Sequence, residues 1–298
     1  MKVLIIDSSS LMYRAYYALP PLKTKNGELV NAVHGFFSLL IKAINDFNPD
    51  YIVTAFDLPA PTFRHKMFRE YKATRSKTPE ELVAQIPIIK EGIKEFNLPV
   101  LEKEGFEADD VIGTAVSFFN KKDFCSVVVS GDMDVLQLVD KKTTAYLFKR
   151  GIKDAGVYDS LKVQEIYNGL KPQQLIDYKA LRGDVSDNIP GVIGIGEKTA
   201  IELIKTFNSI ENIYNEIEKE TAKAGKIKKG VLEKLKQNKK EAFLSKELVT
   251  IKRDVPLNLD INNFQWKGYN DKGLAFFEKM ELKSLIKRIK KKENLSLF

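Results

Sequence analysis

Val3-Leu-Ile-Ile-Asp7 opens the chain with an unbroken apolar run that ends at an acid. Two later segments repeat this arrangement: Tyr51–Phe56 is followed by Asp57, and Ser126–Ser130 is followed two residues later by Asp132. Continuous apolar strands that alternate with helices are typical of a parallel sheet covered on both faces. We therefore predict an α/β fold with a parallel twisted sheet and flanking helices. The three acids should meet at the carboxyl edge of that sheet, where ligands bind.

Segments with helical apolar spacing lie between these strands, and they predominate after about residue 170. The first half is predicted to form helices at 11–19, 33–47, 80–96 and 109–119, with a short strand at 100–101. The second half is predicted to form helices at 172–181, 197–207, 210–217, 230–237 and 239–248, with a mobile Lys- and Gly-rich loop at 219–230. We divide the chain into an α/β part (1–170), a helical part (171–265) and a C-terminal helix with a basic tail (266–298) that packs on the α/β part.

Composition narrows the class of protein. The 298 residues carry a formal charge of +8, and nine lysines lie within 219–240, a distribution typical of nucleic-acid binding. No apolar stretch is long enough to span a bilayer, and His34 and His65 lack the spacing of zinc ligands. The single cysteine, Cys125, is expected to be buried beside Val127–Val129. The lack of a disulfide framework fits the cytoplasm.

Acidic residues gather in clusters although the chain is basic. The clusters are Glu107-Ala-Asp109-Asp110, Asp132-Met-Asp134 and Asp184-Val-Ser-Asp187, and Asp7 and Asp57 bring the set to nine carboxylates. Two carboxylates about 4 Å apart repel by roughly 4 kcal/mol at an effective dielectric constant of 20. Divalent cations explain such gathering most simply, and oxygen-only ligands favour Mg²⁺ or Mn²⁺. A basic surface around a hard-metal centre indicates a nuclease.

Simpler explanations exist for single acids in this set. Acids at the start of the helix that begins near 109 counter the helix dipole, and Asp132 has a position that suits an Asx turn. Asp7 also fits the nucleophile of an aspartate-dependent phosphatase, but that family needs an acid two positions later, where Ser9 stands. We set the phosphatase aside and retain the metal centre.

A basic and aromatic segment follows the second strand. Residues 62–78 contain six cations, Arg64, Lys66, Arg69, Lys72, Arg75 and Lys77, interleaved with Phe63, Phe68 and Tyr71. Cations that contact the phosphate backbone, together with aromatic rings on which bases can stack, are typical of binding to single-stranded nucleic acid. An amphipathic surface helix is the alternative. Since the segment starts just after Asp57, it should begin beside the metals.

A glycine-rich loop, Gly191-Val-Ile-Gly194-Ile-Gly196, joins two predicted helices. No strand precedes it, so it does not fit a dinucleotide-binding turn. Glycines at this place let backbone amides approach a phosphate, and Lys198 lies in the first turn of the second helix. The loop therefore suits a contact to duplex backbone that does not distinguish base sequence.

Taken together, these motifs resemble the 5′-to-3′ exonuclease domain of bacterial DNA polymerase I, within the flap-endonuclease superfamily. The resemblance covers nearly the whole chain. It is most specific in Phe106-Glu-Ala-Asp-Asp-Val-Ile-Gly113, Gly131-Asp-Met-Asp-Val-Leu-Gln-Leu138 and Gly183-Asp-Val-Ser-Asp-Asn-Ile-Pro-Gly191. It implies a PIN-like flap-nuclease core, a helical arch at 62–100 and a C-terminal helix-three-turn-helix DNA-binding region.

The resemblance also implies roles for individual residues. Residues of the first metal position correspond to Asp7, Asp57, Glu107, Asp109, Asp110 and Asp132, and those of the second to Asp134, Asp184 and Asp187. In the arch, Lys72 would act on the scissile phosphate, with Arg64, Tyr71 and Arg75 as DNA contacts, and Arg14 would bind DNA near the reacting bond. The clamp corresponds to Gly191, Gly194, Gly196 and Lys198, in a loop that in the family also binds K⁺ through carbonyls.

The implied activity is two-metal-ion hydrolysis of DNA 5′ flaps, nicks and overhangs, and of RNA–DNA primers, in Okazaki fragment maturation and repair. We expect a cytoplasmic monomer, either free-standing beside a separate DNA polymerase or a fragment of a longer polymerase chain. Two alternatives stay open. A PIN-like ribonuclease shares the acidic sheet edge but leaves the 191–200 loop unexplained, and a non-catalytic DNA-junction binding protein would lack some of the carboxylates.

Overall fold

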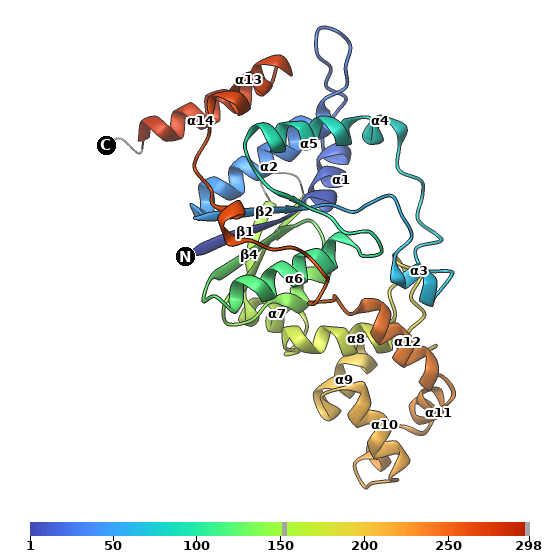
Figure 1. Cartoon of the computed structure of the whole chain (residues 1–298). Coiled ribbons are helices and arrows are strands. Elements are labelled where there is room, and N and C mark those ends of the chain that lie inside the picture. The colour runs from blue at the N-terminus through green and yellow to red at the C-terminus, as the bar shows by residue number, and fades with distance from the viewer. Residues whose placement is uncertain (151–153, 296–298) are drawn as a thin grey trace.

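A computed structural model describes residues 1–150 and 154–295, so residues 296–298 of the predicted basic tail lie outside the described part. Its centre is a six-stranded sheet in the order β3-β2-β1-β4-β5-β6 (Figure 1). The strands are β1 (Lys2–Asp7), β2 (Tyr51–Ala55), β3 (Val100–Leu101), β4 (Cys125–Ser130), β5 (Thr143–Arg150) and β6 (Asp154–Tyr158). The first five run parallel and β6 is antiparallel to β5. The predicted α/β fold is therefore confirmed, while β5 and β6 were not predicted.

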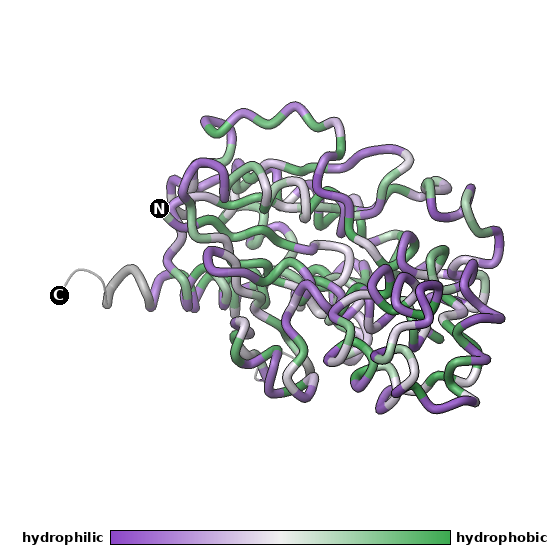
Figure 2. Tube along the Cα trace, turned by 90° about the horizontal axis from the view of Figure 1, so that it is seen from below, coloured by the Kyte–Doolittle hydropathy of each residue, from purple (hydrophilic) through white to green (hydrophobic). Residues whose placement is uncertain are grey.

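Alternate residues of the central strands feed two separate hydrophobic cores. Leu4 and Ile6 of β1 pack with helices on one face, whereas Val3 and Ile5 pack on the other. The first face is covered by α1 (Ser8–Ala18), α2 (Asn31–Phe47), α4 (Glu80–Val83), α5 (Gln85–Glu95), α13 (Asp271–Lys279) and α14 (Lys283–Leu295). The second is covered by α6 (Ala108–Asn120), the 3₁₀ turn η1 (Asp134–Leu138) and α7 (Ser160–Ile166). Figure 2 shows the hydrophobic segments running through the middle of the molecule.

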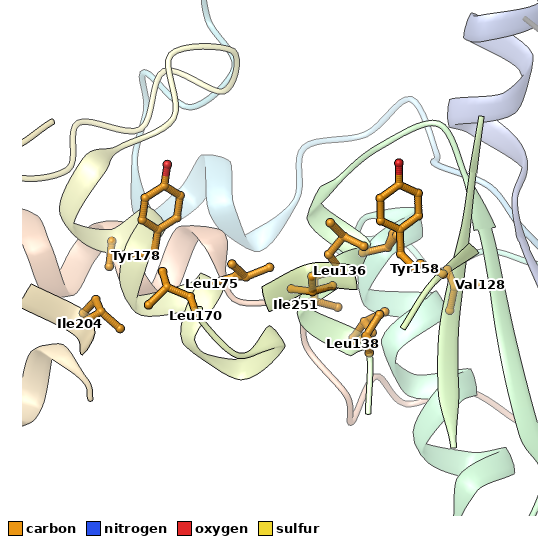
Figure 3. Close-up of a cluster of buried hydrophobic side chains, with 14 of the residues drawn as sticks. Val128, Leu136, Leu138, Tyr158, Leu170, Leu175, Tyr178, Ile204 and Ile251 are labelled. Atoms are coloured by element: carbon orange, nitrogen blue, oxygen red, sulfur yellow. The ribbon is translucent and has the colours of Figure 1, made fainter. Parts of the chain in front are cut away.

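The second core continues without a break into the helical part of the chain. Figure 3 follows it from Val128 of β4 through Leu136 and Leu175 to Ile204. The helical elements are η2 (Pro172–Gln174), α8 (Leu175–Arg182), α9 (Glu197–Phe207), α10 (Ile210–Glu218), η3 (Ala224–Lys226), α11 (Lys229–Gln237), α12 (Lys239–Val249) and η4 (Ile261–Phe264). Because one core serves both parts, the sheet and the helices pack as a continuous body.

Three local expectations need correction. The helix predicted at 80–96 is interrupted between α4 and α5 at Ala84. The amphipathic surface helix that was the alternative for residues 62–78 does not extend through the segment, which forms only the short α3 (Phe63–Met67) followed by turns. Cys125 is exposed rather than buried, because it begins β4 at the open end of the sheet while Val127–Val129 lie inside.

Candidate active site

The acids at the strand ends meet at the carboxyl edge of the sheet. Asp7 ends β1 and caps α1 by accepting a hydrogen bond from the Ser10 backbone N–H at 2.9 Å, and the Ser130 hydroxyl at the end of β4 donates to it at 2.6 Å. Asp57 follows β2 and accepts from the Ala108 N–H at 2.8 Å, at the start of α6. The parallel register thus brings together carboxylates that are up to 125 residues apart in the sequence.

Seven of the nine predicted acids line a single cleft of about 800 Å³. They are Asp7, Asp57, Glu107, Asp109, Asp132, Asp134 and Asp187. The predicted cations Arg14, Arg64, Lys72 and Arg75 line the same cleft, together with Tyr71. Asp110 and Asp184 are not among its lining residues.

Four of these acids have no basic partner. Among the described side chains, no lysine or arginine forms an ion pair with Asp7, Asp57, Asp109 or Asp132. Burial, together with the negative charge of Asp57 and Asp132, raises the pKa of Asp7 to about 7. Burial and the same repulsion raise the pKa of Asp109 well above its usual range. Ionising all four acids together is therefore unfavourable, and no ion pair with a described side chain offsets their charge.

Arg64 and Asp110 form a buried ion pair with each other. The Arg64 guanidinium donates to Asp110 Oδ2 at 2.6 Å and Oδ1 at 2.9 Å, and both side chains are almost fully buried. Its remaining donors reach the carbonyls of Leu248 and Thr250 in and after α12. Asp110 also accepts from the Lys252 N–H at 2.8 Å. This arrangement does not support the expectations that Arg64 contacts DNA and that Asp110 is a metal ligand, because each already satisfies the other away from solvent.

The base of the predicted arch is docked on the loop that carries Asp187. Tyr71 is buried and its hydroxyl donates to Glu107 at 3.0 Å and Asp187 at 3.3 Å. Lys72 lies 3.0 Å from Glu107 and 3.9 Å from Asp187, and Arg75 forms an ion pair with Asp187. Burial would lower the pKa of Lys72, but the two carboxylates outweigh it and raise that pKa. Tyr71 therefore offers no open stacking face, whereas Lys72 and Arg75 reach the cleft.

Lys179 of α8 bridges two acids of the predicted second metal position. Its ammonium donates to Asp184 at 2.8 Å and also to Asp134. Burial raises the pKa of Asp184, but Lys179 and Ser186 outweigh it and lower that pKa to about 2. Burial raises the pKa of Asp134 to about 6 in spite of Lys179. Lys179 was not among the residues predicted from the sequence, although its place five residues before Asp184 was a usable signal.

Helix α1 supplies the cationic and aromatic wall of the cleft. Arg14 donates to the Gly131 carbonyl at 2.8 Å, and a Cβ at residue 131 would come within 2.4 Å of Arg14 Nε. The side chains of Tyr13 and Tyr17, both exposed, also line the cleft. They were missed because helical spacing alone does not distinguish a wall of a cleft from an ordinary exposed face.

The carboxylates of the cleft suit hard divalent cations, although the described side chains do not by themselves surround a metal position. Among them, no group of three or more His, Cys, Asp or Glu side chains is close enough to enclose an ion. All the candidate ligands are carboxylate oxygens, which Mg²⁺ and Mn²⁺ prefer, and Mg²⁺ often uses only one or two of them and keeps several waters. A bound cation would stabilise the ionised forms of Asp7 and Asp109, which burial and mutual repulsion disfavour.

Backbone conformation or close packing requires glycine at residues 191 and 194 of the glycine-rich loop, but not at residue 196. Gly191 (φ +63°) packs on Gly183, since a Cβ there would lie 2.3 Å from the Gly183 nitrogen, and Gly194 has φ +78°. Gly196 has an ordinary backbone and precedes α9, and a Cβ built there would meet nothing within 4 Å. Lys198 is exposed in the first turn of α9. The start of this helix is therefore open to approach.

Comparisons with known proteins cover almost the entire chain. Residues 2–168 match the family described as 5′-3′ exonuclease, N-terminal resolvase-like domain, and residues 170–272 match its C-terminal SAM fold. The chain is 42% identical over 289 residues to DNA polymerase I of Bacillus subtilis, covering 97% of this chain but 32% of that protein. It is 39% identical over 293 residues to a 5′-3′ exonuclease of Aquifex aeolicus, covering 98% and 96%. The chain thus spans about a third of its polymerase relatives.

Solved structures share the fold at lower identity. A structure described as divalent metal ions (zinc) bound to T5 5′-exonuclease superposes with a TM-score of 0.66 at 22% identity, covering 84% of this chain and 89% of that one. The catalytic core of Rad2 in complex with DNA substrate gives a TM-score of 0.61 at 18% identity, covering 97% and 91%. Within the described residues, no helix is long and apolar enough to cross a membrane.

Proposed function

Because the chain belongs to the 5′-3′ exonuclease family, we propose that it is a metal-dependent 5′ nuclease that hydrolyses phosphodiester bonds at DNA 5′ flaps, nicks and overhangs and in RNA–DNA primers. The observation that carries the proposal is the uncompensated acidic edge formed by Asp7, Asp57, Asp109 and Asp132 within a cleft whose other wall is basic. A DNA phosphate could approach this edge only with cations between the two.

The acids divide into two groups in this proposal. Asp7, Asp109 and Asp132, with Asp57 and Glu107, would hold one Mg²⁺ or Mn²⁺, and Asp134, Asp184 and Asp187 would support a second. Such ions, when bound, supply an acidified water as nucleophile and charge neutralisation at the leaving oxygen. We assign Asp110 a structural role, since its oxygens are already engaged by Arg64 and two backbone N–H groups.

The basic residues of the cleft would position the scissile phosphate. Lys72 and Arg75 are now paired with Glu107 and Asp187, so a phosphate that enters would exchange one ion pair for another. The flexible ammonium of Lys72 suits this exchange, because it can rotate from carboxylate to phosphate without losing donors. Arg14, which donates to the Gly131 carbonyl, would add positive charge to the cleft from α1.

The helical part would hold the duplex. The open start of α9, with Gly196 and Lys198, presents backbone N–H groups and a positive side chain, which suit a phosphate. We place the enzyme in the cytoplasm beside a DNA polymerase, in primer removal and repair, and we expect it to act as a monomer.

Cleavage of a labelled 5′-flap DNA and of a single-stranded RNA, each with Mg²⁺ and with EDTA, tests the proposal. We expect cleavage near the flap junction in Mg²⁺, none in EDTA, and little cleavage of the RNA. Preferential cleavage of the RNA would favour the PIN-like ribonuclease. Tight binding of the flap without cleavage in Mg²⁺ or Mn²⁺ would favour a non-catalytic junction protein.

A further inference from the structure

The glycine-rich loop already carries a cation, supplied by a different helix. Lys234 of α11 donates from its ammonium to the Gly194 carbonyl at 2.9 Å. The end of its side chain lies directly against this glycine, because a Cβ at residue 194 would come within 2.7 Å of Lys234 Nζ and 2.9 Å of Cε. The contact therefore depends on two features, an exposed lysine 40 residues away and the missing side chain at Gly194.

A second carbonyl of the loop accepts a hydrogen bond from within the loop itself. Val192 accepts a hydrogen bond from the Ile195 N–H at 2.9 Å, which closes the turn. Gly191 donates its N–H to the Ser245 hydroxyl of α12 at 3.0 Å. A K⁺ ion at this loop, which the family resemblance implies, would need several inward-facing carbonyls. The Lys234 ammonium already occupies the position that a cation bound to the Gly194 oxygen would take. The turn uses one of the two lone pairs of the Val192 oxygen.

We infer that the Lys234 ammonium takes the place of a bound K⁺ and links the Gly194 carbonyl to a DNA phosphate. A lysine ammonium has three donors, and the carbonyl uses one of them. The others are available to a phosphate that reaches the start of α9. The inference rests on the proposed duplex contact of this loop, and it makes that contact independent of the identity of the monovalent cation in solution.

Binding of a fluorescent 5′-flap DNA, measured by anisotropy in KCl and in NaCl at equal ionic strength with EDTA present, tests this inference. The wild-type protein should bind equally in both salts. Lys234→Met keeps the length of the side chain without the ammonium and should bind roughly fivefold more weakly in NaCl, the size of one exposed charged contact. K⁺ can then reach the vacated carbonyl, so KCl should recover part of that loss.

The matched control is Lys236→Met, which removes a lysine from the same helix, and it should bind equally in KCl and NaCl. Thermal melting of both variants confirms that they fold. Distinctly tighter binding of the wild-type protein in KCl than in NaCl would overturn the inference, as would a loss for Lys234→Met no greater than that for Lys236→Met. If the wild-type protein does not bind flap DNA at all, the proposed function itself fails, which is a different result.

Discussion

The acids at the sheet edge and the acids in the loop after α8 differ in the cationic partners that the described side chains give them. At the sheet edge, Asp7 and Asp109 have no cationic partner among the described side chains, and the pKa of each is raised. In the loop after α8, Asp184 is held by Lys179 and Asp187 by Arg75 and Lys72. The same residue type therefore carries unbalanced charge in one region and nearly balanced charge in the other.

This difference predicts unequal affinities for the two ions. An ion at the sheet edge relieves repulsion that already exists, whereas an ion at the second position must displace or share the ammonium of Lys179. We therefore expect the first ion to bind tightly and the second weakly.

The largest effect is expected at the sheet edge. Asp132→Ala should lower the turnover rate on a 5′ flap by on the order of 10³-fold or more, because it would remove a proposed ligand of the more tightly bound ion. DNA binding should persist or tighten, since a charge that repels phosphate is lost. Single-turnover cleavage and anisotropy measure the two effects. Turnover by Asp132→Ala at the wild-type rate in Mg²⁺ would refute the assignment.

The Arg64–Asp110 ion pair tests whether Asp110 has a structural role, in contrast to the acids that we propose as metal ligands. Arg64→Ala should lower the free energy of unfolding by about 3–5 kcal/mol, because Asp110 is left buried without its partner. Chemical denaturation measures this loss. Combining Arg64→Ala with Asp110→Ala should recover part of it, since no unpaired charge remains. An Arg64→Ala protein of normal stability with weakened DNA binding would restore the original expectation of a DNA contact.

The pH dependence of stability tests the unbalanced charge at Asp7. Its pKa is about 7 in the folded protein and 3.8 in the unfolded chain, so folding binds a proton between these values. Stability from this group is therefore greatest below about pH 4 and is lost as the pH rises to 7, by on the order of 2–4 kcal/mol. Metal-free melting curves of wild type and Asp7→Asn should diverge over this range. Parallel curves would contradict the raised pKa.

At the proposed second metal position the expected effect is smaller, and it is a gain in ion affinity rather than a loss of function. Lys179→Met should strengthen binding of the weaker ion by roughly 10-fold, because Asp134 and Asp184 lose their built-in cation. Titration with Mn²⁺, followed by electron paramagnetic resonance, reports both binding steps without any need for cleavage. The tighter step should not move. A change confined to the tighter step would mean that Lys179 acts on the sheet edge instead.

The smallest effect is expected furthest from the acids, at the start of α9. Lys198→Ala should reduce the slope of log K against log salt by about one unit, as the loss of one phosphate contact predicts. Cleavage of flap DNA that is already bound should continue at the wild-type rate. Anisotropy titrations over a range of KCl concentrations give the slope. An unchanged slope would mean that this loop is only a helix connection.

The sequence was sufficient for the sheet edge because strand ends in a parallel sheet share one side. Asp7, Asp57 and Asp132 each follow an apolar run, so their proximity follows from the fold alone. It was not sufficient for the ion pairs. Arg64 and Asp110 are 46 residues apart, and nothing local distinguishes Arg64 from the five other cations of its segment. Only the packing of α3 against α6 and α12 selects it.

The edge hairpin shows a second limit. In Thr143–Arg150, polar and apolar residues do not alternate regularly, and β6 contains Gly156, so neither strand has a strong period of two. Tyr71 shows a third limit, since an aromatic residue in a basic segment suits both stacking on a base and closing a core. Its hydroxyl between Glu107 and Asp187 decides for the latter.

The Arg64–Asp110 pair has a mechanical consequence. Through it, α3 is tied to α6 at the sheet edge and, by the Leu248 and Thr250 carbonyls, to the end of α12. The shared core of Figure 3 reinforces this tie. These contacts fix the distance between the acidic sheet edge and the helices that we propose hold the duplex. The position of the cut should then be counted from the junction, whatever the length of the flap.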